Sequence, residues 1–395
     1  MFVYLDNSAT TKPYSAVTDK MVEYMKEDFG NPSSLHRLGI SAEKAVKSAR
    51  KSVAEALTVR EDELIFTSGG TEADNTALIG AASARQRRGK KIITTAIEHP
   101  AVLEAAGRLE SKGFIVEYIE VDEKGLVDLR ALQEALTEDT LLLSIMGVNN
   151  EVGTIEPIQE IVQIKNEYNK AHGTDVLLHV DAVQAFGKLP LQSNGIDMIA
   201  VSGHKIHGPK GIGALYVRKG LTIEPYMIGG GQERHMRSGT ENVPAIVGFG
   251  QAAKAAKEGF DLRIKNMSSA REYLLEGIKT EIKDIKINGA EKDSLDWDSG
   301  MCCPSVLNIS FLGTRGEVLL HTLEQDGIYV STGSACSSNK KGRSHVLKAM
   351  RLKDKEIEGA IRFSFSEFNT IEEMQYVLEH LKAAVAKFRR LGSFR

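Results

Sequence analysis

An aspartate and a lysine stand at the ends of two successive apolar, strand-like segments. Asp181 follows the segment 176–180, and Lys205 follows the segment 198–202. Alone, the aspartate would be read as a helix or turn cap and the lysine as a surface residue. Their placement one crossover apart indicates instead a shared site at the carboxyl ends of two strands. Such a pair suits pyridoxal phosphate, because the carboxylate keeps the ring nitrogen protonated and the lysine forms a Schiff base.

A run of small residues at Thr67–Glu72 precedes a helix-like stretch at 72–88. Free backbone amides at a helix N-terminus bind phosphate well, although the same pattern also describes a plain loop and cap. The run matches neither G-x-x-x-x-G-K-[ST] nor G-x-G-x-x-G, so a nucleotide-binding interpretation loses support. Gln184 lies one turn beyond Asp181 and could reach the same space.

Three polar residues at other strand-like segments could bind a substrate or move protons. His99 follows 92–97 and could stack over a ring, although a structural histidine is the simpler interpretation. Asn150 ends another strand and could hydrogen-bond a ligand or simply make a turn. Arg362 lies within the apolar strand 360–365, where either a substrate carboxylate or a structural ion pair would satisfy it.

The chain has three cysteines, and one differs from the others in its setting. Cys336 stands among small, polar and basic residues, and Lys340 and Lys341 would favour its thiolate. Cys302 and Cys303 are adjacent in sequence; they could relay sulfur or bind metal, but structural roles are the simpler expectation. Without a C-x-x-C pair, neither a zinc site nor a disulfide framework is expected, which predicts a reducing cytoplasmic environment.

Composition excludes several classes of protein. The 395 residues carry a formal net charge of −3, so no basic field indicates direct nucleic-acid binding. No apolar run is long enough to span a membrane, and the first residues lack the pattern of a signal peptide.

Strand-like and helix-like segments alternate through the middle of the chain, which predicts a mostly parallel α/β sheet with helices on both faces. The predicted strands are 92–96, 115–121, 141–147, 176–180, 198–202 and 214–217, with helices that include 72–88 and 157–171. After about residue 260 the pattern becomes that of a smaller α+β lobe. We therefore predict a large domain at 14–260 and a small domain formed by 1–13 and 261–395.

Several motifs, in order along the chain, resemble the cysteine desulfurases of the NifS/IscS type, in the first group of that family. They are Tyr4–Thr11, Gly30–His36, Val148–Gly153, His207–Gly211 and Arg237–Thr240. The resemblance runs to near residue 385 and implies a pyridoxal phosphate enzyme of the aspartate aminotransferase fold (fold type I). It implies conversion of L-cysteine to L-alanine, with sulfur passing to an enzyme persulfide and then to an acceptor protein.

The resemblance also implies a role for each candidate residue. It makes Lys205 the Schiff-base lysine, Asp181 and Gln184 ring contacts, and His99 the stacking histidine. The phosphate ligands it implies are Gly70, Thr71, Ser202 and His204, with Thr240 lent by the neighbouring subunit of a homodimer. Asn150 and Arg362 match positions that hold substrate cysteine, and Cys336 matches the persulfide-forming nucleophile.

The sequence departs from the family in two places. The chain ends at Arg395, short of the tail with which housekeeping members dock an iron–sulfur scaffold, so the acceptor stays open among iron–sulfur, thiolated tRNA and thiamin routes. The segment 292–304 resembles an insertion of unknown role. An aminotransferase or another lyase of the same fold is the alternative activity, and a cofactor-free sulfur-relay scaffold is a further one.

Overall fold

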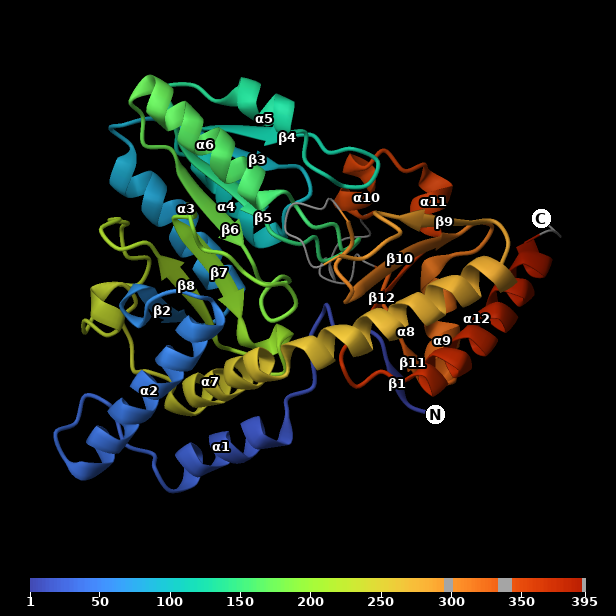
Figure 1. Cartoon of the computed structure of the whole chain (residues 1–395), viewed down its shortest axis with the longest axis horizontal. Helices are drawn as coiled ribbons and strands as arrows, with labels where there is room; N and C mark the ends of the chain where they lie inside the picture. The colour runs from blue at the N-terminus through green and yellow to red at the C-terminus, as the bar shows by residue number, and fades with distance from the viewer. Residues whose placement is uncertain (295–300, 333–342, 393–395) are drawn as a thin grey trace.

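The larger part of the protein is built around a seven-stranded sheet (Figure 1). The computed structural model describes residues 1–294, 301–332 and 343–392. The strand order is β2 (Leu64–Thr67), β8 (Gly213–Val217), β7 (Met198–Ser202), β6 (Leu177–Asp181), β5 (Thr140–Met146), β3 (Lys91–Thr95) and β4 (Ile115–Ile119). Only β8 runs antiparallel to its neighbours in this sheet. The predicted mostly parallel sheet is therefore confirmed, with β2 as a strand that the sequence pattern missed.

Helices cover both faces of this sheet, because its strands are apolar on both sides. Leu142 and Leu177 pack with α3 (Gly70–Arg85) and α4 (Pro100–Glu110) on one face. Leu143 and Leu178, one position further along each strand, pack on the other face. That second layer consists of α1 (Ser15–Lys26), α2 (Arg37–Ala56), α5 (Leu129–Ala135), α6 (Ile158–His172) and α7 (Val243–Glu258).

A second hydrophobic core lies under a three-stranded antiparallel sheet of order β12 (Ala360–Ser364), β10 (Val306–Phe311) and β9 (Ile285–Asn288). The helices that pack in this core are α8 (Phe260–Glu281), α9 (Gly316–Gln325) and α12 (Ile371–Gly392), whereas α10 (His345–Ala349) and α11 (Asp354–Glu358) belong to a separate apolar cluster. The N-terminal β1 (Val3–Tyr4) pairs in parallel with β11 (Ile328–Tyr329), and Val3 and Leu5 are part of this core. The first residues thus pack with the last third of the chain.

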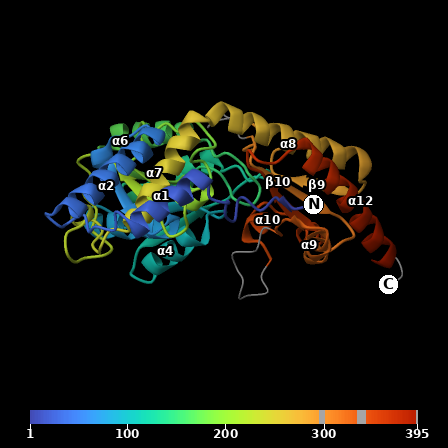
Figure 2. The same ribbon diagram turned by 90° about the horizontal axis from the view of Figure 1, so that it is seen from below.

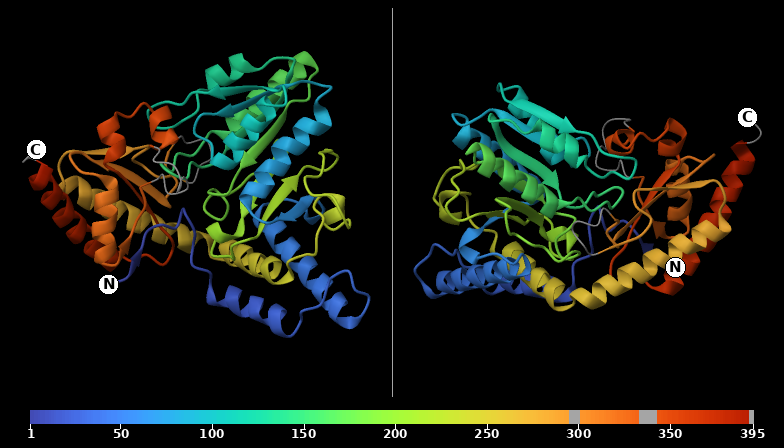
Figure 3. Two further views of the ribbon diagram at one scale, coloured as in Figure 1. Left: turned by 180° about the vertical axis from the view of Figure 1, so that it is seen from behind. Right: turned by 45° about the horizontal axis from the view of Figure 1, so that its top comes forward.

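The two parts meet along a long helix and a shared apolar cluster. Helix α8 follows α7 after Gly259 and runs from the large sheet to the small one, as Figures 1 and 2 show. Ile97, Met146 and Val152 of the large part pack with Val346 and Met350. Figure 3 shows the two parts from behind and from a tilted direction. The boundaries at 13/14 and 260/261 stay predictions.

None of the described helices is long and apolar enough to cross a membrane.

Candidate active site

A cavity of about 210 Å³ lies at the carboxyl ends of the parallel strands, where α/β sheets bind ligands. Its wall includes ten residues that the sequence marked as site candidates: Gly70, Thr71, His99, Asn150, Asp181, Gln184, Ser202, His204, Lys205 and Arg362. These residues come from segments far apart in the chain, so the fold alone brings them together. Ser8 and Ala9, from the N-terminal segment, complete one side of the wall.

Asp181 and Lys205 reach the cavity from neighbouring parallel strands. Asp181 ends β6 and stands in register with Ala200 of β7. Lys205 lies in the short helical turn Gly203–Lys205 that follows β7. Its Nζ donates hydrogen bonds to the carbonyl oxygens of Ala9, at 2.8 Å, and of Ser8. The two strands are parallel neighbours, as predicted. The Lys205 side chain lines the cavity and hydrogen-bonds to the N-terminal segment in its wall.

Burial raises the pKa of Asp181, while the charges of His99 and Lys205 act in the opposite direction. One oxygen of Asp181 accepts a hydrogen bond of 2.9 Å from the backbone N–H of Val183, which fixes the carboxylate orientation. The carboxylate therefore sits where a positively charged partner would be favoured.

The orientation of His99 is set by the start of α4. Its Nδ1 accepts a hydrogen bond of 3.1 Å from the backbone N–H of Ala101, in the N-cap position. Pro100 follows as the first helical residue, where its missing N–H costs nothing. Burial lowers the pKa of His99, with Lys205 and His345 adding to the effect. The neutral imidazole consequently carries its proton on Nε2.

The N-terminus of α3 forms the end of the cavity that suits an anion. Gly70 and Thr71 start the helix, and an adjoining hollow of about 360 Å³ shares these residues with Ser202 and His204. The Ser202 hydroxyl is buried and has no hydrogen-bond partner among the described residues. Burial, together with Lys205 and other cations, lowers the pKa of His204 to about 3. Exposed amides, an unused hydroxyl and nearby lysines fit a phosphate group here.

Gln184 accepts a hydrogen bond from a buried lysine that the sequence analysis did not single out. Lys188 is buried one helical turn further on, and its Nζ donates a hydrogen bond of 2.8 Å to Gln184 Oε1. Gln184 Nε2 donates to the carbonyl oxygen of Ser8 at 2.9 Å. The bond to Lys188 thus decides which end of the Gln184 amide faces the cavity.

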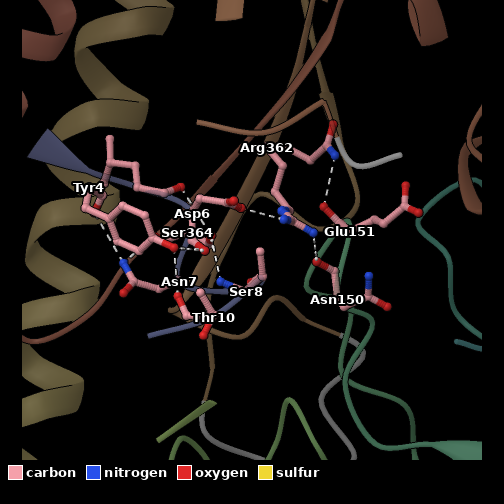
Figure 4. Close-up of polar contacts among 12 residues, drawn as sticks. Tyr4, Asp6, Asn7, Ser8, Thr10, Asn150, Glu151, Arg362 and Ser364 are labelled. Carbon is pink, nitrogen blue, oxygen red and sulfur yellow. Dashed lines mark hydrogen bonds and ion pairs between the residues drawn. The ribbon is translucent and has the colours of Figure 1, made fainter. Parts of the chain in front are cut away.

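Arg362 and Asn150 also line the cavity, and Figure 4 shows their polar contacts. Arg362 Nη1 donates to the backbone oxygen of Asn150 at 3.0 Å, and Nη2 donates to Asp6 Oδ1 at 2.7 Å. Next to Asn150, Glu151 is buried, and burial raises its pKa to about 7. The hydroxyl of Ser344 donates to Glu151 Oε2 at 2.6 Å. Arg362 lines the cavity, as a substrate-binding residue would, and it also forms an ion pair with Asp6. The structure is therefore consistent with both alternatives, substrate contact and structural ion pair.

A buried polar cluster behind Asp181 escaped the sequence analysis. Asp74 lines the cavity from α3, and its Oδ1 lies 3.5 Å from His179 Nε2. His179 Nδ1 lies 2.9 Å from the Ser144 hydroxyl. Burial, reinforced by Asp181 and Glu98, raises the pKa of Asp74 well above its usual range. Asp74 lies one helical turn after Gly70 in α3, and this spacing could have indicated that both residues face the cavity.

Two predicted functional residues, Thr240 and Cys336, lie elsewhere or cannot be placed. Thr240 is exposed in the single chain and does not line the cavity. Cys336 lies outside the described residues. Cys302 and Cys303 are buried, and burial raises the pKa of the Cys302 thiol to about 11, which disfavours a thiolate. In the described part of the chain, no group of three or more histidine, cysteine or acidic residues could hold a metal ion.

Comparison with known proteins identifies the family. Residues 3–377 match the model of the class-V aminotransferases. The cysteine desulfurase IscS of Dictyoglomus turgidum is 42% identical over 395 residues, covering 100% of this chain and 97% of its own. The IscS of Methanosarcina thermophila is 44% identical over 392 residues, covering 99% of this chain and 93% of its own.

A solved structure agrees with this family assignment. A NifS-like protein superimposes with a TM-score of 0.89 at 40% identity, covering 98% of this chain and 100% of its own. The predicted fold type I is thereby confirmed. The chain belongs to the class-V aminotransferase family, and within it to the NifS/IscS-type cysteine desulfurases.

Proposed function

We propose that this chain is an L-cysteine desulfurase that releases L-alanine and keeps the sulfur as a persulfide on Cys336. The assignment is carried by the one cavity that gathers Lys205, Asp181 and His99 with Asn150 and Arg362. Relatives named cysteine desulfurase match the chain along its whole length and support the same activity.

Pyridoxal 5′-phosphate is the cofactor that fits this cavity. Gly70, Thr71, Ser202 and His204 would hold the phosphate, with Thr240 supplied by the neighbouring subunit. Asp181 and Gln184 would contact the ring, His99 would lie against it, and Lys205 would hold it covalently. When bound, the cofactor supplies a carbonyl that combines with amines and a ring that accepts electrons from the substrate α-carbon.

Arg362 and Asn150 bind and orient the substrate. The planar guanidinium matches a carboxylate, so Arg362 holds the α-carboxylate of cysteine at one end of the cavity. Asn150 adds a neutral hydrogen bond from the adjoining turn. Since Arg362 and Lys205 line the same cavity, a substrate whose carboxylate is bound by Arg362 is held in the space that Lys205 shares.

Lys205 removes the proton from the substrate α-carbon once its amine is released. His99 holds its proton on Nε2 and has a lowered pKa, so it can pass a proton to or from the substrate. Both groups are only partly exposed, which limits the access of bulk water to these protons.

Cys336 accepts the sulfur. Its thiolate attacks the thiol sulfur of the substrate, so one S–S bond forms and the C–S bond breaks. The bonding electron pair stays on the substrate carbon, which is protonated to the methyl group of alanine. The enzyme is left with a persulfide, and no outside oxidant or reductant is required.

The persulfide sulfur passes to an acceptor protein in iron–sulfur cluster assembly or in thio-cofactor or tRNA synthesis. We infer a homodimer, because Thr240 matches a family position that serves the phosphate site of the neighbouring subunit and is exposed in the single chain. It is placed in the cytoplasm, where a reducing environment keeps Cys336 free.

Product analysis tests the activity. The purified protein, loaded with pyridoxal phosphate, should turn L-cysteine into L-alanine, and into sulfide when a reductant is present. An aminotransferase of the same fold would instead make a keto acid and transfer the amine. A keto acid without alanine would overturn the assignment.

A further inference from the structure

Arg362, the proposed substrate-binding arginine, already has a carboxylate partner within the chain. Its side chain is only 2% exposed, and Nη2 lies 2.7 Å from Asp6 Oδ1 (Figure 4). Nη1 is bound to the backbone oxygen of Asn150, while Nε has no partner among the described residues. A guanidinium buried this deeply is costly without an opposite charge, so Asp6 acts as its counter-ion.

The segment that carries Asp6 is fixed on β12 by several hydrogen bonds. Asn7 Nδ2 donates to the carbonyl oxygen of Ser364 at 2.8 Å, and the backbone N–H of Ser8 donates to Ser364 Oγ at 2.9 Å. The Tyr4 hydroxyl donates to the carbonyl oxygen of Thr10 at 2.9 Å, which closes the turn around Asp6. Asp6 is therefore held beside Arg362 by the backbone on both of its sides.

The Asp6 side chain is 22% exposed, whereas that of Arg362 is almost completely covered. Asp6 can therefore be solvated when its bond to the arginine weakens, but Arg362 cannot. A second carboxylate that arrives at the guanidinium has to share it with Asp6, and two carboxylates at one cation repel each other.

We propose that Asp6 is the resident counter-ion of Arg362, that it competes with the α-carboxylate of the substrate, and that it thereby limits the preference for carboxylate-bearing amines. The inference rests on the proposed function only in taking an amino acid as the substrate. Asp6 limits the affinity for substrate and product, because each must displace part of an existing ion pair. Removal of its charge leaves a buried cation that gains more from binding a carboxylate.

The variant Asp6→Asn tests this competition, since the amide keeps the shape and an oxygen acceptor for Nη2 but loses the charge. Apparent dissociation constants of L-alanine and of ethylamine, which lacks the carboxylate, are measured on the holoenzyme by absorbance and calorimetry. The ratio of the ethylamine constant to the alanine constant isolates the contribution of the carboxylate. We expect this ratio to rise about tenfold, as for a change in one hydrogen bond to a charged group.

Two further variants show whether the effect passes through Arg362. In an Arg362→Gln background, Asp6→Asn should raise the ratio less, because the cation for which the two carboxylates compete is gone and only their direct repulsion remains. Asp175→Asn is the matched control, since Asp175 pairs with Arg85 away from the cavity and its loss should change nothing. Should Asp6→Asn fail to fold or to hold cofactor, Asp6→Ser removes the same charge with a smaller side chain.

An unchanged or lower ratio in the folded Asp6 variants would overturn the proposal, because Asp6 would then only orient Arg362 or support the fold. The same holds if the ratio rises equally in the Arg362→Gln background. Neither alanine nor ethylamine contains sulfur, so these outcomes are independent of desulfuration. Failure of the wild-type protein to convert L-cysteine would contradict the proposed function and leave the measured ratio intact.

Discussion

Lys205 Nζ lies 2.8 Å from the carbonyl oxygen of Ala9, so the start of the chain closes one side of a cavity that residues of the large part and Arg362 of β12 line elsewhere. The N-terminal segment also packs on β12 through Ser364. The N-terminal segment thereby connects the small sheet to the Lys205 amine, to which we assign the covalent bond with the cofactor. A change at Lys205 should affect the chemistry more than the fold, since the segment that carries Ser8 and Ala9, to which the amine donates, is also anchored on β12.

Lys205→Ala should lose the absorbance of the covalently held cofactor and all measurable turnover. Phosphate contacts at Gly70 and Thr71 can still retain some cofactor, so loss of binding is expected to be partial. The measurement is the absorbance spectrum before and after borohydride treatment, with the exposed Lys90→Ala as control. An active Lys205→Ala protein that borohydride still traps would show that another lysine holds the cofactor.

Asp181→Asn should keep the fold and lower the rate by about two to four orders of magnitude, as expected when a charge essential to catalysis is removed. The amide can still accept the hydrogen bond from Val183, so the local geometry is retained. Steady-state kinetics and a thermal unfolding curve check the two parts of this expectation. A rate near that of the wild type would mean that another residue faces the ring nitrogen.

Glu151 should make stability depend on pH. Its usual pKa is 4.5, and burial raises it to about 7 in the folded protein. Between these values the folded state binds more protons than the unfolded state, so the contribution of Glu151 is fully present below pH 4.5 and is lost as pH rises through 7. The loss is about 3 kcal/mol in total.

Comparison with Glu151→Gln isolates this contribution. The free energy of unfolding is measured for both proteins across the pH range in which each unfolds reversibly. The difference, wild type minus variant, should fall as pH rises and then level off above about 7. A difference that stays flat or increases with pH would show that Glu151 is already charged in the folded protein at low pH.

The sequence predicted those site residues whose positions follow from neighbouring parallel strands that end at the same edge of the sheet. Asp181 and Lys205 were found because the carboxyl ends of parallel strands meet at one edge of a sheet. Asp6 and Asp74 were missed because their importance depends on tertiary contacts with Arg362 and His179, which no local pattern records. The direction of β8 was missed for the same reason, because strand direction is set by the path of the whole chain.

Mixing two inactive variants should restore activity if Thr240 serves the site of the neighbouring subunit. In a dimer of one Thr240→Ala chain and one Lys205→Ala chain, one site has both residues intact and the other has neither. Activity should therefore reappear after subunit exchange. Under random pairing half of the dimers are mixed and each has one intact site, so up to about a quarter of all sites should become active. Exchange between two samples of Lys205→Ala is the control.

Whether the protein is a dimer decides how a failure of the mixed variants to regain activity is interpreted. Sedimentation of the wild-type protein should show a dimer at the concentrations used for kinetics. A fully active monomer would exclude a shared site, and so would a dimer in which Thr240→Ala alone keeps the wild-type rate and cofactor affinity.

Cys336→Ser should separate binding and deprotonation of cysteine, which do not need this thiol, from transfer of its sulfur. The variant should stay yellow and change its spectrum on addition of L-cysteine, yet release no alanine. A serine hydroxyl remains protonated near neutral pH, whereas a thiol beside Lys340 and Lys341 in sequence is partly ionised. In the wild type, limited cysteine should leave one reductant-labile sulfur on the peptide that carries Cys336.

The two other cysteines provide the matched controls. Cys302→Ala and Cys303→Ala should retain desulfurase activity, because both thiols are buried and the raised pKa of Cys302 keeps it protonated. Each variant should unfold at a lower temperature than the wild type, since it leaves a small space in the core. Alanine release by Cys336→Ser at the wild-type rate would contradict the assignment. Mapping of the first persulfide to Cys302 or Cys303 would move the sulfur acceptor to a buried thiol and require the protein to open before each turnover.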